Sequence, residues 1–297
     1  GGIDLDVLAS FEQPVTEAAR RLRAADESVA RLDTVWNLGP LQERLDEFGG
    51  KVRSLHRQAA LAALAVQRAP AMLGAEGPRR YLVLLGNPAE ARDLGGHIGN
   101  WAELVIDRGV LDLATVGRPL DLAAPSGDAE LETVDGYPPS LTEMKPLAYP
   151  QNWGANPDMG VVASISSDLF QQKTGRSIDG VLYADPVAFS NLLSITGPID
   201  MPALGIRLGA DEAVRFLTSD QFVRYGGSPA ADDAVTQLVR DAFDRFTQVA
   251  LPGPRQLSDL FHPTVRTGRL KLFSLHDEDR SLLAALGLDG TLQIPEG

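Results

Sequence analysis

The residues best suited to chemistry in this 297-residue chain lie in one short segment, NPAEARDLGGH, at positions 87–97. Glu90 can bind a hard cation through its carboxylate oxygens, and Arg92 can hold a phosphate or carboxylate through two parallel hydrogen bonds. Gly95 and Gly96 let a ligand approach the backbone closely, because glycine has no side chain. The segment lacks the Gly-Lys-Ser/Thr ending of a Walker loop and is not a GxGxxG motif. It therefore predicts either a ligand site or a surface turn with solvated charges.

A second candidate segment, YPQNWGANPDMG, spans residues 149–160 and leads into an expected helix. Asp158 can serve there as a metal ligand or a general base, with Trp153 as a stacking wall and Asn156 as a further polar contact. The alternative is that Asp158 only caps the helix, since an Asp side chain accepts unpaired backbone N–H groups.

A third candidate consists of two carboxylates, Asp179 and Asp185, which bracket the apolar segment GVLYA. Carboxylates at strand ends often line clefts in α/β proteins. The alternative, which we prefer for both residues, is that they belong to turns that flank a buried strand. The chain has neither an HExxH zinc motif nor a GxSxG elbow, so neither motif supports a zinc protease or an α/β-hydrolase.

Composition excludes several further classes of protein. The chain has no cysteine, which rules out disulfides and thiolate chemistry, and its net charge of −13 argues against nucleic-acid binding. With 44% hydrophobic residues it can form one or two domains with a sizeable core. No run reaches the roughly 18–20 apolar residues of a membrane-spanning helix.

Two long amphipathic helices are expected within residues 7–69, because apolar residues recur every three or four positions. The segment NLGP at 37–40 breaks them into a hairpin. The Pro/Gly-rich segment at 69–80 marks a boundary, so we expect a helical hairpin or stalk over residues 1–72 and an α/β domain over 73–297. The hairpin is interpreted as a stalk or packing scaffold; the alternative is an oligomerisation zipper, which would make the protein a homo-oligomer.

The second domain alternates between strand and helix patterns, which favours helices packed on a sheet. Low hydrophobicity predicts long loops over residues 117–160. The expected strands are 81–86, 101–107, 110–116, 179–186 and 268–275. The expected helices are 160–173, 186–195, 210–218, 229–250 and 277–286.

Several blocks of this domain resemble a bacterial membrane-anchored family, domain of unknown function 4012. The resemblance is carried by LGAEGPRRYLVLLGNPAEARDLGG, NWGANPDMG, DGVLYADPVAFSNLLSITGPI and LFSLHDEDRSLLAALGLDG, and it extends over residues 73–291. Proteins of this family usually begin with a transmembrane helix followed by a helical hairpin. The resemblance therefore implies an extracytoplasmic protein, anchored to the membrane by a segment outside this sequence.

The order of blocks is also similar, more weakly, to the LytR–CpsA–Psr phosphotransferases. These enzymes transfer polyprenyl-pyrophosphate-linked glycans, using carboxylate-bound magnesium and arginines on the pyrophosphate. This similarity implies a LytR–CpsA–Psr-like mixed sheet flanked by helices, preceded by the antiparallel helical hairpin. Asn87 stands where those enzymes have an aspartate, and GRPLD, with Arg118 and Asp121, stands in the place of their Pro-Arg-Asp turn.

On this resemblance, Arg92 would clamp a phosphate, and Glu90 or Asp158 would hold Mg²⁺. Asn87, Gly95 and Gly96 would lie over a cleft for the lipid phosphate. The implied function is binding, and transfer as a possible activity, of a polyprenyl-phosphate-linked glycan or another isoprenoid phosphate. The alternative is a non-catalytic scaffold or assembly module of the cell envelope.

Overall fold

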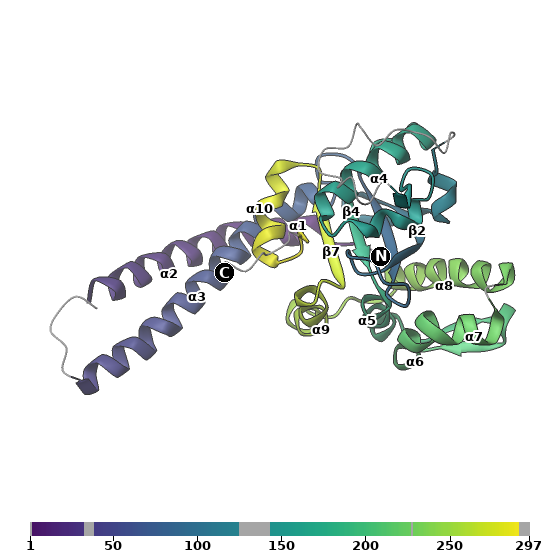
Figure 1. The fold of residues 1–297 in the computed structure, drawn as a ribbon. Coiled ribbons are helices and arrows are strands. Elements are labelled where there is room, and N and C mark those ends of the chain that lie inside the picture. Colours follow the sequence, from purple (N-terminus) through teal and green to yellow (C-terminus); the bar gives the residue numbers. More distant parts are fainter. Residues whose placement is uncertain (1, 33–38, 125–142, 227, 291–297) are drawn as a thin grey trace.

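A computed structural model describes residues 2–32, 39–124, 143–226 and 228–290 of the chain (Figure 1). It confirms the predicted mixed α/β architecture with an N-terminal helical hairpin. Part of the segment predicted as loops, residues 125–142, lies outside the described residues. None of the described helices is long and apolar enough to cross a membrane.

The hairpin projects away from the rest of the molecule (Figure 1). It consists of a short α1 (Leu5–Ser10) and two long helices, α2 (Glu12–Leu32) and α3 (Gly39–Met72), which lie side by side. His56 on α3 lies 2.9 Å from the Asp26 carboxylate on α2, which links the two long helices by a polar contact. At its root, Met72 packs with Leu282 and Leu283 of the last helix, α10 (Asp277–Leu286), so the hairpin is attached to the domain by a small apolar cluster.

Five strands form one mixed sheet in the order β3-β2-β1-β4-β7. Their bounds are β1 (Arg79–Asn87), β2 (His97–Asp107), β3 (Val110–Gly117), β4 (Gly180–Ala184) and β7 (Leu270–Ser274). The central pair, β1 and β4, is parallel, and every other neighbouring pair is antiparallel. A tight turn joins β2 to β3, with Arg108 and Gly109 both at positive φ.

The strand register brings several chain segments to one edge of the sheet. The carboxyl ends of β1 and β4 lie there, and Asn87 is paired with His97 at the start of β2. The end of β3 and the start of β7 reach the same edge, because Gly117 pairs with Trp101 and Leu270 with Ala184. Side chains that follow these strands are therefore brought together.

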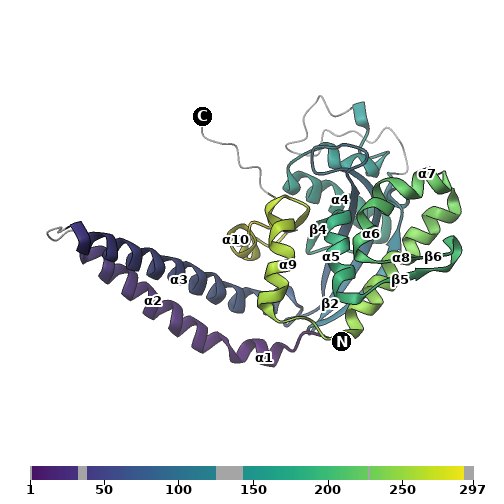
Figure 2. The ribbon, with the colours of Figure 1, turned by 90° about the horizontal axis from the view of Figure 1, so that it is seen from below.

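Helices cover both faces of the sheet, as Figures 1 and 2 show. On one face, α4 (Met159–Thr174) and the 3-10 helix η4 (Pro150–Ala155) form the main core with strand residues such as Leu82, Leu84 and Val181. Helices α5 (Pro186–Thr196), α8 (Pro229–Gln248) and α9 (Pro254–Arg266) lie on the other face. A further 3-10 helix, η1 (Pro119–Leu122), follows β3.

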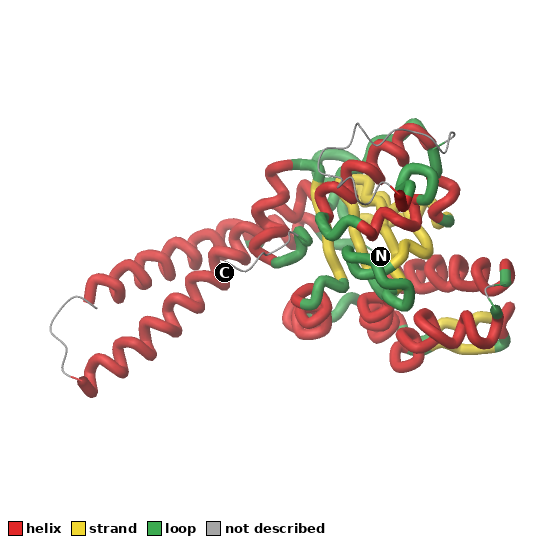
Figure 3. Tube along the Cα trace, in the orientation of Figure 1, coloured by secondary structure: helices red, strands yellow, loops and turns green. Residues whose placement is uncertain are grey.

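A second core lies beyond the sheet, between α5 and α8. Figure 3 shows the short strands and helices of this part of the chain apart from the main sheet. It is completed by elements that the sequence patterns indicated only in part: β5 (Ile199–Met201), the 3-10 helix η5 (Pro202–Leu204), β6 (Ile206–Leu208), α6 (Ala210–Arg215), a π-helix η6 (Phe216–Asp220) and α7 (Gln221–Tyr225). The expected helix at 210–218 therefore changes to π geometry from Phe216 onward.

Candidate functional site

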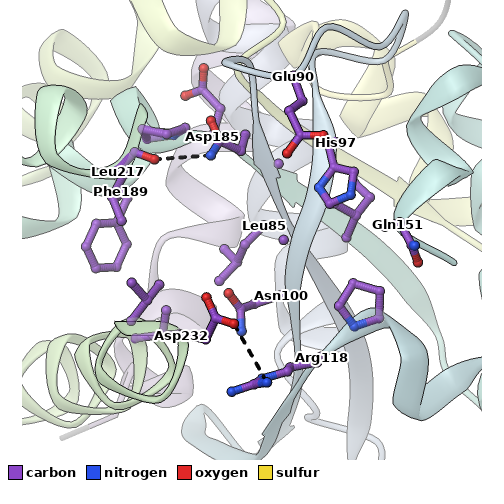
Figure 4. Close-up of a pocket in the computed structure, with 18 of the residues that line it drawn as sticks. Leu85, Glu90, His97, Asn100, Arg118, Gln151, Asp185, Phe189, Leu217 and Asp232 are labelled. Atoms are coloured by element: carbon purple, nitrogen blue, oxygen red, sulfur yellow. Dashed lines mark hydrogen bonds and ion pairs between the residues drawn. The ribbon is translucent and has the colours of Figure 1, made fainter. Parts of the chain in front are cut away.

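A pocket of about 370 Å³ opens between the converging edge of the sheet and the second core (Figure 4). One wall is apolar and comes mainly from α5, η6, α7 and α8. The other wall is polar and comes from the strand ends, the loop after β1, and η1 and η4. The apolar lining includes Leu85, Ile98, Phe189, Leu217, Phe222, Val235, Leu238 and Val239, and the polar lining includes Asn87, Glu90, His97, Asn100, Arg118, Gln151, Asp185, Gln221 and Asp232.

Asn87 fastens the end of β1 to the opposite wall of the pocket. Its Nδ2 donates to the Leu217 carbonyl oxygen at 3.1 Å, and its Oδ1 accepts from the Ala89 backbone N–H at 3.0 Å. Leu217 lies within the π-helix, and the wider hydrogen-bond spacing of a π-helix departs from the usual i→i−4 ladder. Both ends of the Asn87 amide are thus engaged in holding the pocket together.

Arg118 is the cationic side chain of the pocket lining. Its guanidinium donates to Asp233 at 2.6 Å and lies 3.8 Å from Asp232, both on the first turns of α8. The side chain is 43% exposed, so solvent screens these contacts and they contribute little to stability. Asp121, the other predicted residue of this turn, accepts the Arg118 backbone N–H at 2.7 Å and stabilises η1. It is exposed and is not among the pocket residues.

Three polar side chains of the pocket have no hydrogen-bond or ion-pair partner among the described residues: Glu90, His97 and Gln151. Figure 4 shows the Glu90 carboxylate beside the His97 ring, and the Oε1 of Gln151 is buried without a partner. Partial burial lowers the pKa of His97 from its ordinary value, and the nearby charge of Glu90 opposes this effect. These side chains are free to interact with a ligand.

The two glycines of the NPAEARDLGGH segment are required by the fold around them. Gly95 and Gly96 have φ angles of 143° and 145°, which L-residues with side chains rarely adopt. A Cβ on Gly95 would lie 2.7 Å from the Tyr183 hydroxyl, and one on Gly96 would overlap the Asn87 carbonyl group. Neither glycine is among the pocket residues, so their visible role is to let the loop close over β1 and β4.

Arg92 points away from the pocket toward η4. Its guanidinium donates to the Ala91 carbonyl oxygen at 2.8 Å and to Asn152 Oδ1 at 3.2 Å, and its Nε is buried without a partner. Glu90 lines the pocket and Arg92 does not. The two residues expected to act together on a phosphate and its cation therefore lie on different sides of the loop.

The residues predicted from the segment 149–160 also lie outside the pocket. Asp158 caps α4, because its Oδ1 accepts from Gly160 at 2.7 Å and from Val161 at 3.3 Å, as the capping alternative predicted. Asn156 Oδ1 accepts the Asp158 N–H and stabilises the same turn. Trp153 is 0% exposed and its indole donates to the Pro146 carbonyl oxygen, so the predicted stacking wall is wrong: the ring is buried in the main core.

The two carboxylates that bracket β4 are both engaged in the protein. Asp185 lines the pocket, caps α5 through Val187 and Ala188, and pairs with Arg269 at 2.7 Å. Asp179 lies at the opposite end of β4 and pairs with Arg79 and His276. Only one of the two therefore belongs to the pocket.

The residues expected to hold Mg²⁺ do not form a cation site. Glu90 lines the pocket, whereas Asp158 lies outside it and its Oδ1 accepts the backbone N–H groups of α4. Within the described parts of the chain, no group of three His, Asp or Glu side chains is placed to hold a metal ion.

Sequence reasoning missed most of the pocket. Phe189, Val235 and Leu238 looked like ordinary core positions of amphipathic helices, and they do line the second core as well as the pocket. Asn100 lies just before the expected strand 101–107, and its Nδ2 donates to Thr236 Oγ1 of α8 at 3.2 Å. Gln151 lies inside the candidate segment 149–160, but the roles predicted for that segment were assigned to its neighbours, among them Trp153 and Asp158.

Comparisons with known proteins give a match to one family model and no activity. None of the curated proteins matches the chain. Among solved structures, the chain is similar to one described as the transcriptional regulator yvhJ from Bacillus subtilis, with 11% sequence identity, coverage of 70% of this chain and 76% of that chain, and a TM-score of 0.38. Residues 76–222, which include β1 to β4, η1, η4 and the pocket wall as far as α7, match the model of the family described as protein of unknown function (DUF4012).

Proposed function

We propose that the pocket binds an amphipathic ligand made of an apolar chain and a phosphate head. The ligand class is that of isoprenoid phosphates and polyprenyl-phosphate-linked glycans of the cell envelope. The observation that carries this proposal is the arrangement of an apolar wall and a cation, Arg118, around one pocket. The weak sequence similarity to the LytR–CpsA–Psr phosphotransferases supports the same ligand class, and with it an extracytoplasmic, membrane-anchored location.

The apolar wall fits the chain of such a ligand. Phe189, Leu217, Val235, Leu238 and Val239 present hydrocarbon from three helical segments, and burial of each methylene group contributes about 0.8 kcal/mol. The volume, about 370 Å³, is at the small end of the range for small-molecule sites. The pocket is therefore suited to the phosphate-proximal part of a chain.

Arg118 rather than Arg92 is placed to bind the phosphate. It lines the pocket, is partly exposed, and has more donors than its two carboxylate neighbours use. Arg92 is held against η4 outside the pocket. A phosphate has to compete with Asp233 for the guanidinium, so this aspartate is expected to weaken binding.

Titration calorimetry with geranyl phosphate tests this proposal. We expect saturable binding to the wild type, at least about tenfold weaker binding to Arg118→Ala, because a charge-assisted hydrogen bond is lost, and tighter binding to Asp233→Asn. Arg92→Ala is the matched control and should bind as the wild type does. Loss of binding in Arg92→Ala, with Arg118→Ala unaffected, would move the phosphate to Arg92; no binding to folded wild type would overturn the proposal.

A second candidate function is a non-catalytic assembly module of the envelope. It is favoured by exposed apolar side chains on the projecting hairpin, Phe48 at 56% and Leu55 at 51%. A protein with this function should self-associate in sedimentation experiments and should lose that association when both residues are replaced by serine. Monomeric wild type at every concentration would exclude self-assembly through this surface.

A further inference from the structure

We propose that Glu90, His97 and Gln151 form a separate subsite for an uncharged group rich in hydroxyl or amide N–H donors, such as a sugar linked to the phosphate. This inference rests on the proposed function, because it concerns the ligand of the same pocket. It specifies the chemical group of the ligand that lies next to the phosphate and the side chains that bind this group.

The polar side chains of the pocket fall into two groups. Asn87, Asn100 and Arg118 already bind Leu217, Thr236 and Asp233, and these bonds join the two walls of the pocket. Asp185 and Gln221 are likewise bound within the protein. Within the described polar lining, only Glu90, His97 and Gln151 have no such bond to another side chain or carbonyl group; Glu90 lies in the loop after β1, His97 in β2 and Gln151 in η4.

Burial makes this lack of partners informative. Gln151 Oε1 is buried without a hydrogen bond, and buried polar atoms in native proteins nearly always have a partner. His97 is half-buried, and Figure 4 shows its ring beside the Glu90 carboxylate. Glu90 is exposed, so the buried Gln151 Oε1 is the atom that most needs a partner. A ligand that donates a hydrogen bond to this oxygen satisfies an atom that no described residue satisfies.

The three side chains offer mostly acceptors, which identifies the chemistry of the missing partner. The Glu90 carboxylate accepts only, Gln151 presents an unused carbonyl oxygen, and a neutral imidazole has one acceptor nitrogen. The ligand group must therefore bring donors, as sugar hydroxyls and acetamido N–H groups do. A second phosphate is disfavoured at this end because its charge would face the Glu90 carboxylate.

Binding of three soluble probes tests this subsite: geranyl phosphate, geranyl pyrophosphate and geranyl phosphoryl-N-acetylglucosamine. We expect the sugar-bearing probe to bind wild type at least about tenfold more tightly than geranyl phosphate, the equivalent of one or two good hydrogen bonds. The pyrophosphate should show no comparable gain. Gln151→Leu and Glu90→Leu should each remove most of the gain from the sugar, taken as the ratio of the affinities for the sugar-bearing probe and for geranyl phosphate in the same variant.

Two further variants distinguish loss of the subsite from a general effect of substitution. Gln171→Leu changes an exposed glutamine of α4 and should bind all three probes as the wild type does. Glu90→Gln keeps an acceptor oxygen and should retain part of the gain. Equal affinities of wild type for the phosphate and sugar probes, or a gain that survives both leucine variants, would overturn the subsite while the proposed function stands. Absence of geranyl phosphate binding would overturn both.

Discussion

Single residues around the pocket differ in how much of their hydrogen-bonding capacity the protein itself uses. Asn87 is fully engaged, which explains why an amide stands at this position: one end must donate to a carbonyl oxygen and the other must accept from an N–H. A carboxylate can only accept when ionised. The amide is thus a structural requirement of this pocket, whatever the chemistry of its ligand.

His97 gives the pocket a pH dependence whose sign follows from its burial. Because burial lowers its pKa in the folded protein below the ordinary 6.5, the unfolded chain binds this proton more readily. The free energy of unfolding should therefore decrease as the pH falls through 6.5. Urea unfolding at pH 7.5 and pH 5.5 measures this decrease, which should be smaller in His97→Gln.

The control for this measurement is His262→Gln, which changes an exposed histidine on α9. NMR titration provides an independent check, because Glu90→Gln removes a charge that raises the pKa of His97 and should move the midpoint further down. An identical pH dependence in wild type and His97→Gln would contradict the prediction.

The sequence predicted which residue types occur near the site better than it predicted which residues they contact. Asp158 was correctly predicted as a possible cap, since Asp before an apolar helix has a local signature. The direction of Arg92 has no such signature, because its partner Asn152 is 60 positions away and is brought close only by the packing of η4 on the sheet. Trp153 was misjudged because an aromatic ring in a polar segment looks exposed until the segment folds inward.

At the scale of elements, strands and long helices followed from periodicity, whereas short and irregular elements did not. The expected strands at 81–86 and 110–116 correspond to β1 and β3, and the helix expected at 277–286 has the same bounds as α10. The short strands β5 and β6 and the helix α9 were not predicted. The π-helix was not predicted, and the hydrogen bond from Asn87 to the Leu217 carbonyl oxygen within it is a tertiary contact that the local sequence does not show.

Asn87→Asp tests whether this contact holds β1 against the π-helix. At neutral pH the new carboxylate would face the Leu217 carbonyl oxygen without a donor, and we expect a loss of about 1–3 kcal/mol in the free energy of unfolding. Urea denaturation measures the loss. At pH 3 a protonated aspartate can donate again, so the difference from wild type should shrink.

Asn87→Ala is the companion variant, and it removes both hydrogen bonds of the amide. Its loss should show no recovery at pH 3, because alanine has no group to protonate. Wild-type stability of Asn87→Asp at neutral pH would show that the contact with Leu217 contributes nothing.

At the scale of the whole molecule, the hairpin and the α/β domain differ in how deeply their residues are buried. No described residue of α2 is buried, whereas Leu82 and Leu84 of β1 are 0% exposed. Local opening is easiest where few apolar contacts must break. Hydrogen–deuterium exchange should therefore be faster, by about 100-fold or more, for amides of α2 than for amides of β1.

Met72→Ala provides a control at the hairpin root, where Met72 packs against Leu282 and Leu283. This variant should increase exchange in α3 and α10 and leave the centre of β1 unchanged. Equal protection of α2 and β1 in wild type would show that the hairpin and the sheet unfold as one unit.

The paired strands β4 and β7 are far apart in the sequence, so β7 is synthesised well after β4. β4 is complete at residue 184, but its second neighbour, β7, follows only after α5, the second core and α9. Until residues 270–274 leave the ribosome, the nascent β4 has one unpaired edge, which is the kind of edge on which strands of other chains can add. β7 thus covers the free edge of β4 only late in synthesis, and chains that terminate before β7 should be prone to aggregate.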